Sequence, residues 1–170
     1  MTKKKVYVGG DLLTFGSQML REWEKQQVEN LGFDIHSAKD DKEINDKSNQ
    51  TVESNNDLPN KIFKKDTDGM VDSDILIFDV ANTSVGTTAE IGQWAMIHEL
   101  CEYTLDPFLT KLASKPIFFH SSDIRDTDIP ETGHNRSHSY NAYLVGCCNR
   151  CNEKGIQTWD EIIEELKQIV

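Results

Sequence analysis

The chain has 170 residues, which suits a single domain spanning residues 1–170 that buries about two thirds of the surface it exposes when unfolded. Its 29 acidic residues outnumber its 18 basic residues and give a formal net charge of −11, which disfavours binding to a nucleic-acid polymer or to an anionic membrane. No apolar run approaches the length of a membrane span, and the first residues lead into a predicted strand rather than a signal segment, so we expect a soluble cytoplasmic protein.

The chain begins with a predicted strand over residues 5–9, which runs into the turn signal Gly9-Gly10-Asp11. A helix is expected after Ser17, and Gly32, a residue type that commonly stops helices, is expected to end it. Apolar and aromatic residues recur along this segment at helical spacing and predict one buried face. That face comprises Met19, Leu20, Trp23, Val28 and Leu31.

A long polar segment follows a short second strand at residues 33–35. Residues 36–59 are acidic and almost free of aliphatic side chains, and a loop of that length is either functional or disordered. A helix is then predicted to begin at Asn60 and to end just before the next strand. Four of its apolar residues are expected to face inward: Ile62, Phe63, Met70 and Val71.

The apolar run at residues 75–78 is rich in β-branched and aromatic side chains, which favours a buried strand of a parallel sheet. A turn over residues 82–86 follows, and a helix is predicted to begin near Thr87. Its inward face comprises Ile91, Trp94, Ala95 and His98. In an open α/β sheet such a junction lies at the carboxyl end of the strands, where ligands bind and the helix start offers unpaired N–H groups.

Glu90 stands near the start of this helix and has two interpretations. A carboxylate at this place would be held ionised and aimed at a ligand. Alternatively, Thr87-x-x-Glu90 is a capping box, in which the Glu90 side chain returns a hydrogen bond to the backbone of Thr87. The spacing alone favours neither interpretation.

Residues 115–120 predict a fourth strand, and residues 121–139 a long surface loop. The chain closes with a helix that has Thr158 as its N-cap and Glu161 at its third position. The buried face of this helix comprises Ile162, Ile163, Leu166 and Ile169. The succession of strands and helices predicts an α/β fold, a single-domain doubly wound parallel sheet of the flavodoxin-like or Rossmann-like type with helices on both faces.

The four cysteines are too few for a disulfide scaffold and fit a reducing compartment: Cys101, Cys147, Cys148 and Cys151. Cys148 and Cys151 have the spacing of a metal-ligand pair, but no second Cys or His pair follows at zinc-finger spacing. We therefore expect the cluster to be structural and predict no metal site.

Four short motifs lie near the ends of the predicted elements. They are Tyr7-x-Gly9, Asp66 eight residues before Asp74, Gly86-x-x-x-Glu90-x-Gly92 and Asn141-x-x-x-x-Gly146. In these motifs, and in the order of its elements over nearly the whole length, the chain resembles the nucleoside 2-deoxyribosyltransferase family.

The resemblance implies a role for four of these residues. Glu90 is matched to the family's nucleophile, and Tyr7 to the residue that hydrogen-bonds that carboxylate. Asp66 is matched to a residue that serves in base protonation or sugar orientation. Asn141 is matched to a residue that reaches the sugar hydroxyl in the neighbouring subunit, so the resemblance also implies a homo-oligomer with shared active sites.

Three further residues are candidates for substrate binding. Gly9 and Gly86 belong to the motifs, and Asp41 lies in the segment that corresponds to a loop closing over the nucleobase in the family.

Each of the other matches also has a simpler interpretation. Tyr7 could be a core aromatic residue, and Asp66 a solvated charge on a helix; an Asn such as the one at position 141 often opens a helix.

The reaction that the resemblance implies transfers 2-deoxyribose between nucleobases by a retaining double displacement, through a covalent deoxyribosyl ester on Glu90. Its partners are 2′-deoxynucleosides or deoxynucleotides and free nucleobases, and no metal or organic cofactor is required. Where the family usually has an Asp that binds the 5′-hydroxyl, this chain has Ser84. A Ser there resembles the related 2′-deoxynucleoside 5′-monophosphate N-hydrolases, so hydrolysis of monophosphates is an alternative. A non-catalytic nucleotide-binding module on the same fold is another.

Overall fold

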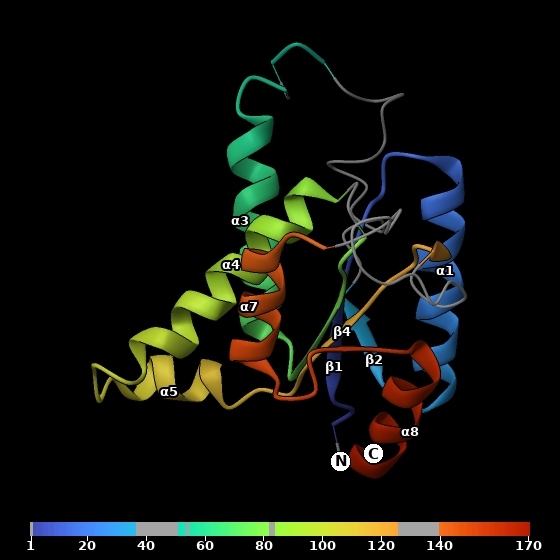
Figure 1. The fold of residues 1–170 in the computed structure, drawn as a ribbon. Coiled ribbons are helices and arrows are strands. Elements are labelled where there is room, and N and C mark those ends of the chain that lie inside the picture. Colours follow the sequence, from blue (N-terminus) through green and yellow to red (C-terminus); the bar gives the residue numbers. More distant parts are fainter. Residues whose placement is uncertain (1, 37–50, 54, 82–83, 126–139) are drawn as a thin grey trace, which may run out of the picture.

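The structure is a computed structural model, and it describes residues 2–36, 51–53, 55–81, 84–125 and 140–170. Its centre is a sheet of parallel strands in the order β2-β1-β3-β4-β5 (Figure 1). The strands are β1 (Lys5–Gly9), β2 (Asp34–His36), β3 (Ile75–Asp79), β4 (Ile117–His120) and β5 (Ile156–Gln157). The helices are α1 (Phe15–Asn30), α3 (Leu58–Asp72), α4 (Val85–Leu100), α5 (Pro107–Ala113), α7 (Ala142–Cys151) and α8 (Trp159–Ile169).

Helices cover both faces of the sheet (Figure 1). Val28 of α1 and Ile162 of α8 pack into one buried cluster, on the same face as Ile77 of the central strand. Helices α3, α4, α5 and α7 contribute to a second cluster on the opposite face. The predicted doubly wound α/β fold is therefore confirmed.

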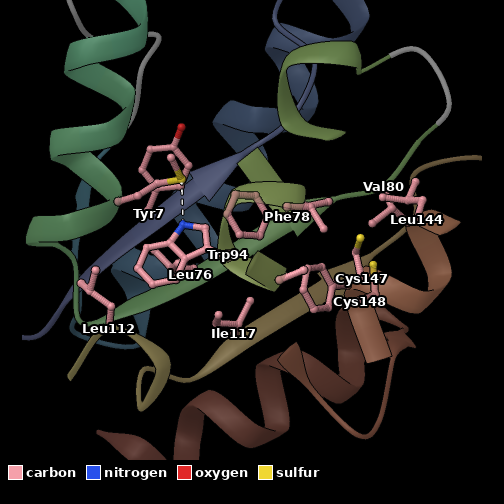
Figure 2. Close-up of a cluster of buried hydrophobic side chains, with 14 residues drawn as sticks. Tyr7, Leu76, Phe78, Val80, Trp94, Leu112, Ile117, Leu144, Cys147 and Cys148 are labelled. Carbon is pink, nitrogen blue, oxygen red and sulfur yellow. Dashed lines mark hydrogen bonds between the residues drawn. The ribbon is translucent and has the colours of Figure 1, made fainter. Parts of the chain in front are cut away.

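The central strand β3 supplies both clusters, and all five of its residues are buried. Leu76 and Phe78 point to the α3, α4 and α7 side, where Figure 2 shows them beside Trp94, while Ile75 and Ile77 point to the α1 and α8 side. Because helices cover both faces, this strand has a continuous apolar run instead of an alternating pattern. Because β1, β3 and β4 are paired in parallel, their carboxyl ends lie together along one edge of the sheet.

Helix α4 begins at Val85, earlier than the predicted start near Thr87, with Ser84 in the N-cap position. This start makes Thr87 the third helical residue and puts Glu90 in the next turn. Ile91, Trp94 and Ala95 are buried as predicted. The earlier start changes what Glu90 can do, because a capping-box glutamate must stand at the third position of its helix.

The predicted buried face of α1 is wrong in part. Met19 and Trp23 are 59% and 45% exposed, and the buried residues of the helix are Arg21, Glu24 and Val28. These three residues recur at helical spacing, so the helix turns a partly polar stripe toward the sheet. Ion pairs stabilise this stripe, because Arg21 pairs with Glu24 and with Asp79 at the end of β3. The helix also begins before Ser17, which stands at its third position and completes a capping box with Thr14.

Helix α3 likewise buries less than predicted. Met70 is buried and Val71 packs against the core, but Phe63 and Ile62 are 58% and 37% exposed and line a cleft against α4. Helices α5 and α7 and the short strand β5 were not predicted. Strand β5 has only two residues, too few for a recognisable pattern.

The C-terminal helix agrees with its sequence signals. Thr158 and Glu161 form the predicted capping box at the start of α8, and Ile162 and Leu166 are buried against the sheet. Within the described part of the chain, no helix combines the length and the apolar composition that crossing a membrane would require.

Candidate functional site

A cavity of about 290 Å³ lies at the carboxyl edge of the sheet. Its walls come from the end of β1 and the loop after it, from the first turns of α4, and from Asp66 of α3. This is the edge at which open α/β sheets bind ligands. The cavity therefore brings together most of the residues that the motifs singled out: Tyr7, Gly9, Asp66, Ser84, Gly86 and Glu90.

Glu90 is held from the neighbouring strand, not by its own helix end. The Tyr7 hydroxyl donates a hydrogen bond of 3.0 Å to Oε1 of Glu90. The other oxygen, Oε2, is buried and has no hydrogen-bond partner among the described residues. The capping-box interpretation is wrong, because the helix begins at Val85 and the Glu90 carboxylate pairs with Tyr7. A buried acceptor without a partner is uncommon and calls for a functional explanation.

The environment of Glu90 disfavours its ionised form, so the expectation that the helix start holds this carboxylate ionised is wrong. Burial and then the negative charge of Asp66 raise the pKa of Glu90 to about 7, although the Tyr7 hydrogen bond acts in the opposite direction. Burial and then the charge of Glu90 raise the pKa of Tyr7 above its usual value, so this hydroxyl keeps its proton and stays a donor. Near neutral pH, the ionised and the protonated forms of the Glu90 carboxyl group are therefore both populated.

Gly9 matters because the Glu90 carboxylate lies directly against it. A Cβ at this position would lie 3.1 Å from Oε2 of Glu90, 2.8 Å from the Phe78 ring and 3.0 Å from the Tyr7 ring. Real Cβ atoms essentially never approach other atoms as closely as 2.8 Å, so no larger residue fits without displacing the ring. Gly86 is different, since a Cβ there would meet nothing within 4 Å.

Asp66 lies at the boundary between this cavity and a second one. A cleft of about 410 Å³ between α3 and α4 shares Asp66, Gly86 and Glu90 with the first cavity. The remaining lining of this cleft is mainly apolar and includes Ile62, Phe63, Met70 and Ala89. The site thus has a polar half near the β1 and α4 ends and an apolar half between α3 and α4.

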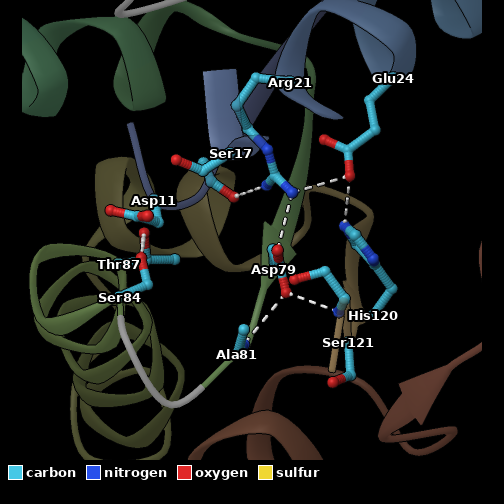
Figure 3. A network of polar contacts seen from close by, with 12 residues as sticks. Asp11, Ser17, Arg21, Glu24, Asp79, Ala81, Ser84, Thr87, His120 and Ser121 are labelled. Carbon is cyan, nitrogen blue, oxygen red and sulfur yellow. Dashed lines mark hydrogen bonds and ion pairs between the residues drawn. The ribbon is translucent and has the colours of Figure 1, made fainter. Parts of the chain in front are cut away.

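Ser84 and Thr87 form the polar wall at the start of α4. Both side chains are buried, and the Ser84 hydroxyl donates a hydrogen bond of 2.6 Å to the Thr87 hydroxyl. Asp11, from the loop after β1, lines the same cavity and is drawn beside them in Figure 3. The motifs did not identify Asp11. Its only sequence signal is its place directly after Gly9-Gly10, at the end of the first strand.

Asn141 does not line the Glu90 cavity. It is exposed, and its Oδ1 atom caps α7 by accepting hydrogen bonds of 2.9 Å from the Tyr143 N–H and 3.3 Å from the Leu144 N–H. It lies instead in a groove between α4 and α7, with Thr88 and Gly92. Within one chain, Asn141 is a helix cap, and its predicted reach into a neighbouring subunit stays a prediction. Asp41 lies outside the described residues.

The cysteine cluster is part of the core. All four cysteines are free thiols, and Cys147 and Cys148 pack on α7 against the sheet. Burial is the main cause that raises the pKa of Cys148 and of Cys151 to about 12, which keeps both thiols protonated. Among the residues that the structure describes, no group of three or more His, Cys, Asp or Glu side chains could hold a metal ion.

A buried ionic network, which the sequence did not predict, lies next to the end of β1 (Figure 3). Arg21 Nη2 donates to Asp79 Oδ2 at 2.7 Å and to Glu24 Oε1 at 2.9 Å. His120 Nε2 lies 3.2 Å from the same Glu24 oxygen. The available signal was the polar residue that ends each of two buried strands, Asp79 in β3 and His120 in β4.

The fold is similar to solved structures. A conserved protein from Enterococcus faecalis V583 has a TM-score of 0.69 and 20% sequence identity, with 99% of this chain and 100% of that chain covered. A 2-deoxyribosyltransferase from the psychrotolerant bacterium Bacillus psychrosaccharolyticus has a TM-score of 0.55 and 13% identity, with 94% of this chain and 90% of that one covered. At these identities the similarity concerns the fold. No protein-family model and no curated protein sequence matches this chain.

Proposed function

We propose that this protein is a nucleoside 2-deoxyribosyltransferase that moves 2-deoxyribose between nucleobases, with Glu90 as its nucleophile. The observation that carries the proposal is the Glu90 carboxylate, which is held by Tyr7 and shares a cavity with a second carboxylate, Asp66. A carboxylate with a structural role is usually paired with a cation or N–H donors, whereas this one has a raised pKa and an oxygen without a hydrogen-bond partner among the described residues. The similarity in fold to a 2-deoxyribosyltransferase supports the same assignment.

In the first step, a Glu90 oxygen attacks the anomeric carbon of a 2′-deoxynucleoside. A C–O bond forms to the carboxylate as the C–N bond to the base breaks, and the electron pair of that bond leaves with the base nitrogen. In the form that reacts, Glu90 is ionised and the proton that the two carboxyl groups share is on Asp66, at the boundary of the two cavities, which we assign to deliver it to the departing base. The sugar lacks an electron-withdrawing 2′-hydroxyl, so it carries the positive charge of the transition state well.

In the second step, a nitrogen of another base attacks the same carbon. The C–O bond to Glu90 breaks, its electron pair returns to the carboxylate, and the N–H proton of the incoming base passes to Asp66. Two inversions leave the sugar with its original configuration. The apolar half of the site, with Ile62 and Phe63, suits a flat base, and the polar half suits the sugar hydroxyls.

Asp11 favours nucleosides over 5′-monophosphates as substrates. Ser84 lacks the carboxylate that would repel a phosphate, which is the specific observation in favour of the hydrolase alternative. Asp11, however, contributes a carboxylate to the same cavity wall as Ser84 and Thr87. A phosphate there would meet a like charge, whereas the 5′-hydroxyl of a nucleoside could donate a hydrogen bond to it. We therefore assign the 5′ end of a nucleoside to this wall.

A trapped intermediate tests the proposal. Incubation with deoxyinosine alone should add one deoxyribosyl group to the protein, seen by intact-mass spectrometry and located on a peptide containing Glu90. Adenine added afterwards should discharge the ester and yield deoxyadenosine. A binding module would bind deoxyinosine without any mass change, and that result would reject the transferase.

The hydrolase alternative has its own signature in the same assay. With deoxyinosine 5′-monophosphate as substrate, a hydrolase releases deoxyribose 5-phosphate at a rate that adenine does not change. A transferase needs the acceptor base and shows ping-pong dependence on both substrates. Hydrolysis confined to the monophosphate would therefore replace our assignment with the alternative.

A further inference from the structure

The buried network of Arg21, Glu24, Asp79 and His120 lies next to the proposed site but does not line its cavity. These side chains are 5%, 0%, 2% and 4% exposed, respectively. Removing so many charges from water costs several kcal/mol per ion, and apolar residues of the same volume often stabilise a fold as well or better. Stability alone therefore does not account for a charged cluster at this place.

The network joins the three strand ends that carry the loops of the site. Asp79, at the end of β3, accepts hydrogen bonds of 3.0 Å from the Ala81 N–H and from the Ser122 N–H through its Oδ1 atom. Burial tends to raise the pKa of Asp79, but the charges of His120 and Arg21 and these hydrogen bonds lower it overall, so Asp79 is ionised. Its other oxygen holds Arg21, which connects the end of β3 to the end of β1.

Arg21 in turn reaches the backbone beside Glu90. Its Nη1 atom donates a 3.3 Å hydrogen bond to the Gly9 carbonyl. A Cβ on Gly10 would collide with the guanidinium, so this group lies directly against Gly10. Gly9 is also the residue against which Oε2 of Glu90 packs. A continuous chain of contacts therefore runs from Asp79 and Glu24 through Arg21 and Gly9 to the carboxylate.

We propose that Arg21 is a positioning residue, which holds the Gly9 backbone against the Glu90 carboxylate and so keeps water away from it. Glu24 and Asp79 hold the guanidinium in place, and His120 contacts the same Glu24 oxygen from β4. Within the part of the chain that the structure describes, the titratable groups that act on Glu90 are Tyr7 from β1 and Asp66 from α3. If the Gly9 backbone moves away, water reaches Oε2, and the ionised form of Glu90 becomes easier to form. Only the kinetic part of this inference rests on the proposed function.

Arg21→Met alone is a poor test, because it leaves two buried carboxylates without their guanidinium partner and can unfold the protein. The triple variant Arg21→Met/Glu24→Gln/Asp79→Asn removes these charges together and should fold. Gly10→Ala keeps every charge and pushes the guanidinium away from Gly9. Lys154→Met is the control, since it removes an ion pair of 2.7 Å with Glu165 that is far more exposed.

The decisive measurement is the titration of Glu90 by NMR of protein labelled with ¹³C in its glutamate carboxyl groups, with Glu90→Gln identifying the signal. The triple variant and Gly10→Ala should each lower the midpoint by at least one pH unit from its wild-type value of about 7, and Lys154→Met should not. Base exchange should lose about a hundredfold in kcat with a smaller change in KM, because misplacement of a reacting group acts mainly on the chemical step.

The outcomes separate the two proposals. If the wild-type protein exchanges no bases but the midpoint still falls in both variants, Arg21 positions Glu90 and the proposed reaction is wrong. Should folded Gly10→Ala and triple-variant proteins keep the wild-type midpoint, Arg21 has only a structural role and this inference is overturned. If the triple variant does not fold, Gly10→Ala alone decides in the same way.

Discussion

Tyr7→Phe tests how the site controls the charge of Glu90, the proposed nucleophile. The substitution removes the 3.0 Å hydrogen bond to Glu90 and leaves the buried ring in place. A hydrogen bond to an ionised group contributes about 1.5–3 kcal/mol, and each pKa unit corresponds to about 1.4 kcal/mol. Because the Tyr7 hydrogen bond lowers the pKa of Glu90, its loss should raise that pKa from about 7 by about one to two units.

The consequence is a shifted pH profile. At pH 7, about half of Glu90 is ionised in the wild-type protein, and the variant should retain only about 1–10% in this form, a loss of roughly five- to fiftyfold in rate. The loss should largely disappear above about pH 9, where most of the carboxylate is ionised in both proteins. The assay is exchange of deoxyinosine with adenine, followed from pH 5 to pH 9.5 by chromatography.

A matched control is available on the surface. Tyr103 donates a 3.1 Å hydrogen bond to Glu99, but this pair is exposed at the end of α4, so Tyr103→Phe should leave the profile unchanged. A Tyr7→Phe protein with the wild-type acid limb would show that Tyr7 does not set the ionisation of Glu90. A loss that is equal at every pH would show that the hydroxyl acts directly on the substrate.

Three further predictions concern other parts of the site. Glu90→Gln should lower activity at least about a thousandfold. It should also raise Tm at pH 8 but not at pH 4. The pKa of Glu90 in the folded protein, about 7, lies above its usual value of 4.5, so the wild-type protein loses up to about 3 kcal/mol of stability as pH rises between these two values, and the variant does not. A Tm difference independent of pH would contradict this assignment. Asp11→Asn should raise kcat/KM for deoxyinosine 5′-monophosphate at least about tenfold relative to deoxyinosine, because it removes one negative charge beside the 5′ position. Ser84→Asp adds such a charge and should lower the same ratio. Equal ratios in the wild type and both variants would place the 5′ end elsewhere. Mixing inactive Glu90→Gln with inactive Asn141→Ala after reversible dissociation should restore activity if Asn141 serves the neighbouring subunit, and hybrids that stay inactive would confine it to capping α7.

The local sequence determines most of the elements of this protein. The run Ile75–Phe78 forms the buried strand β3, and the helical spacing of Ile91, Trp94 and Ala95 forms the inward face of α4. Thr158 and Glu161 start α8 as their spacing predicts. These signals are readable because backbone geometry and burial act within one element. The pairing of Tyr7 with Glu90 came from a resemblance of motifs, since 83 positions separate the two residues.

Only the tertiary structure decided which face of α1 is buried and which residues share the site. Arg21 and Glu24 replace Met19 and Trp23 on the buried face because Asp79 and His120 end two strands on that side, a compensation that no pattern within the helix reveals. Asp11 reaches the wall that Ser84 and Thr87 form because β1 and β3 are neighbouring parallel strands. Helical and strand periods report which residues turn inward; which inward residues meet depends on the order of the strands, and that order is a property of the whole sheet.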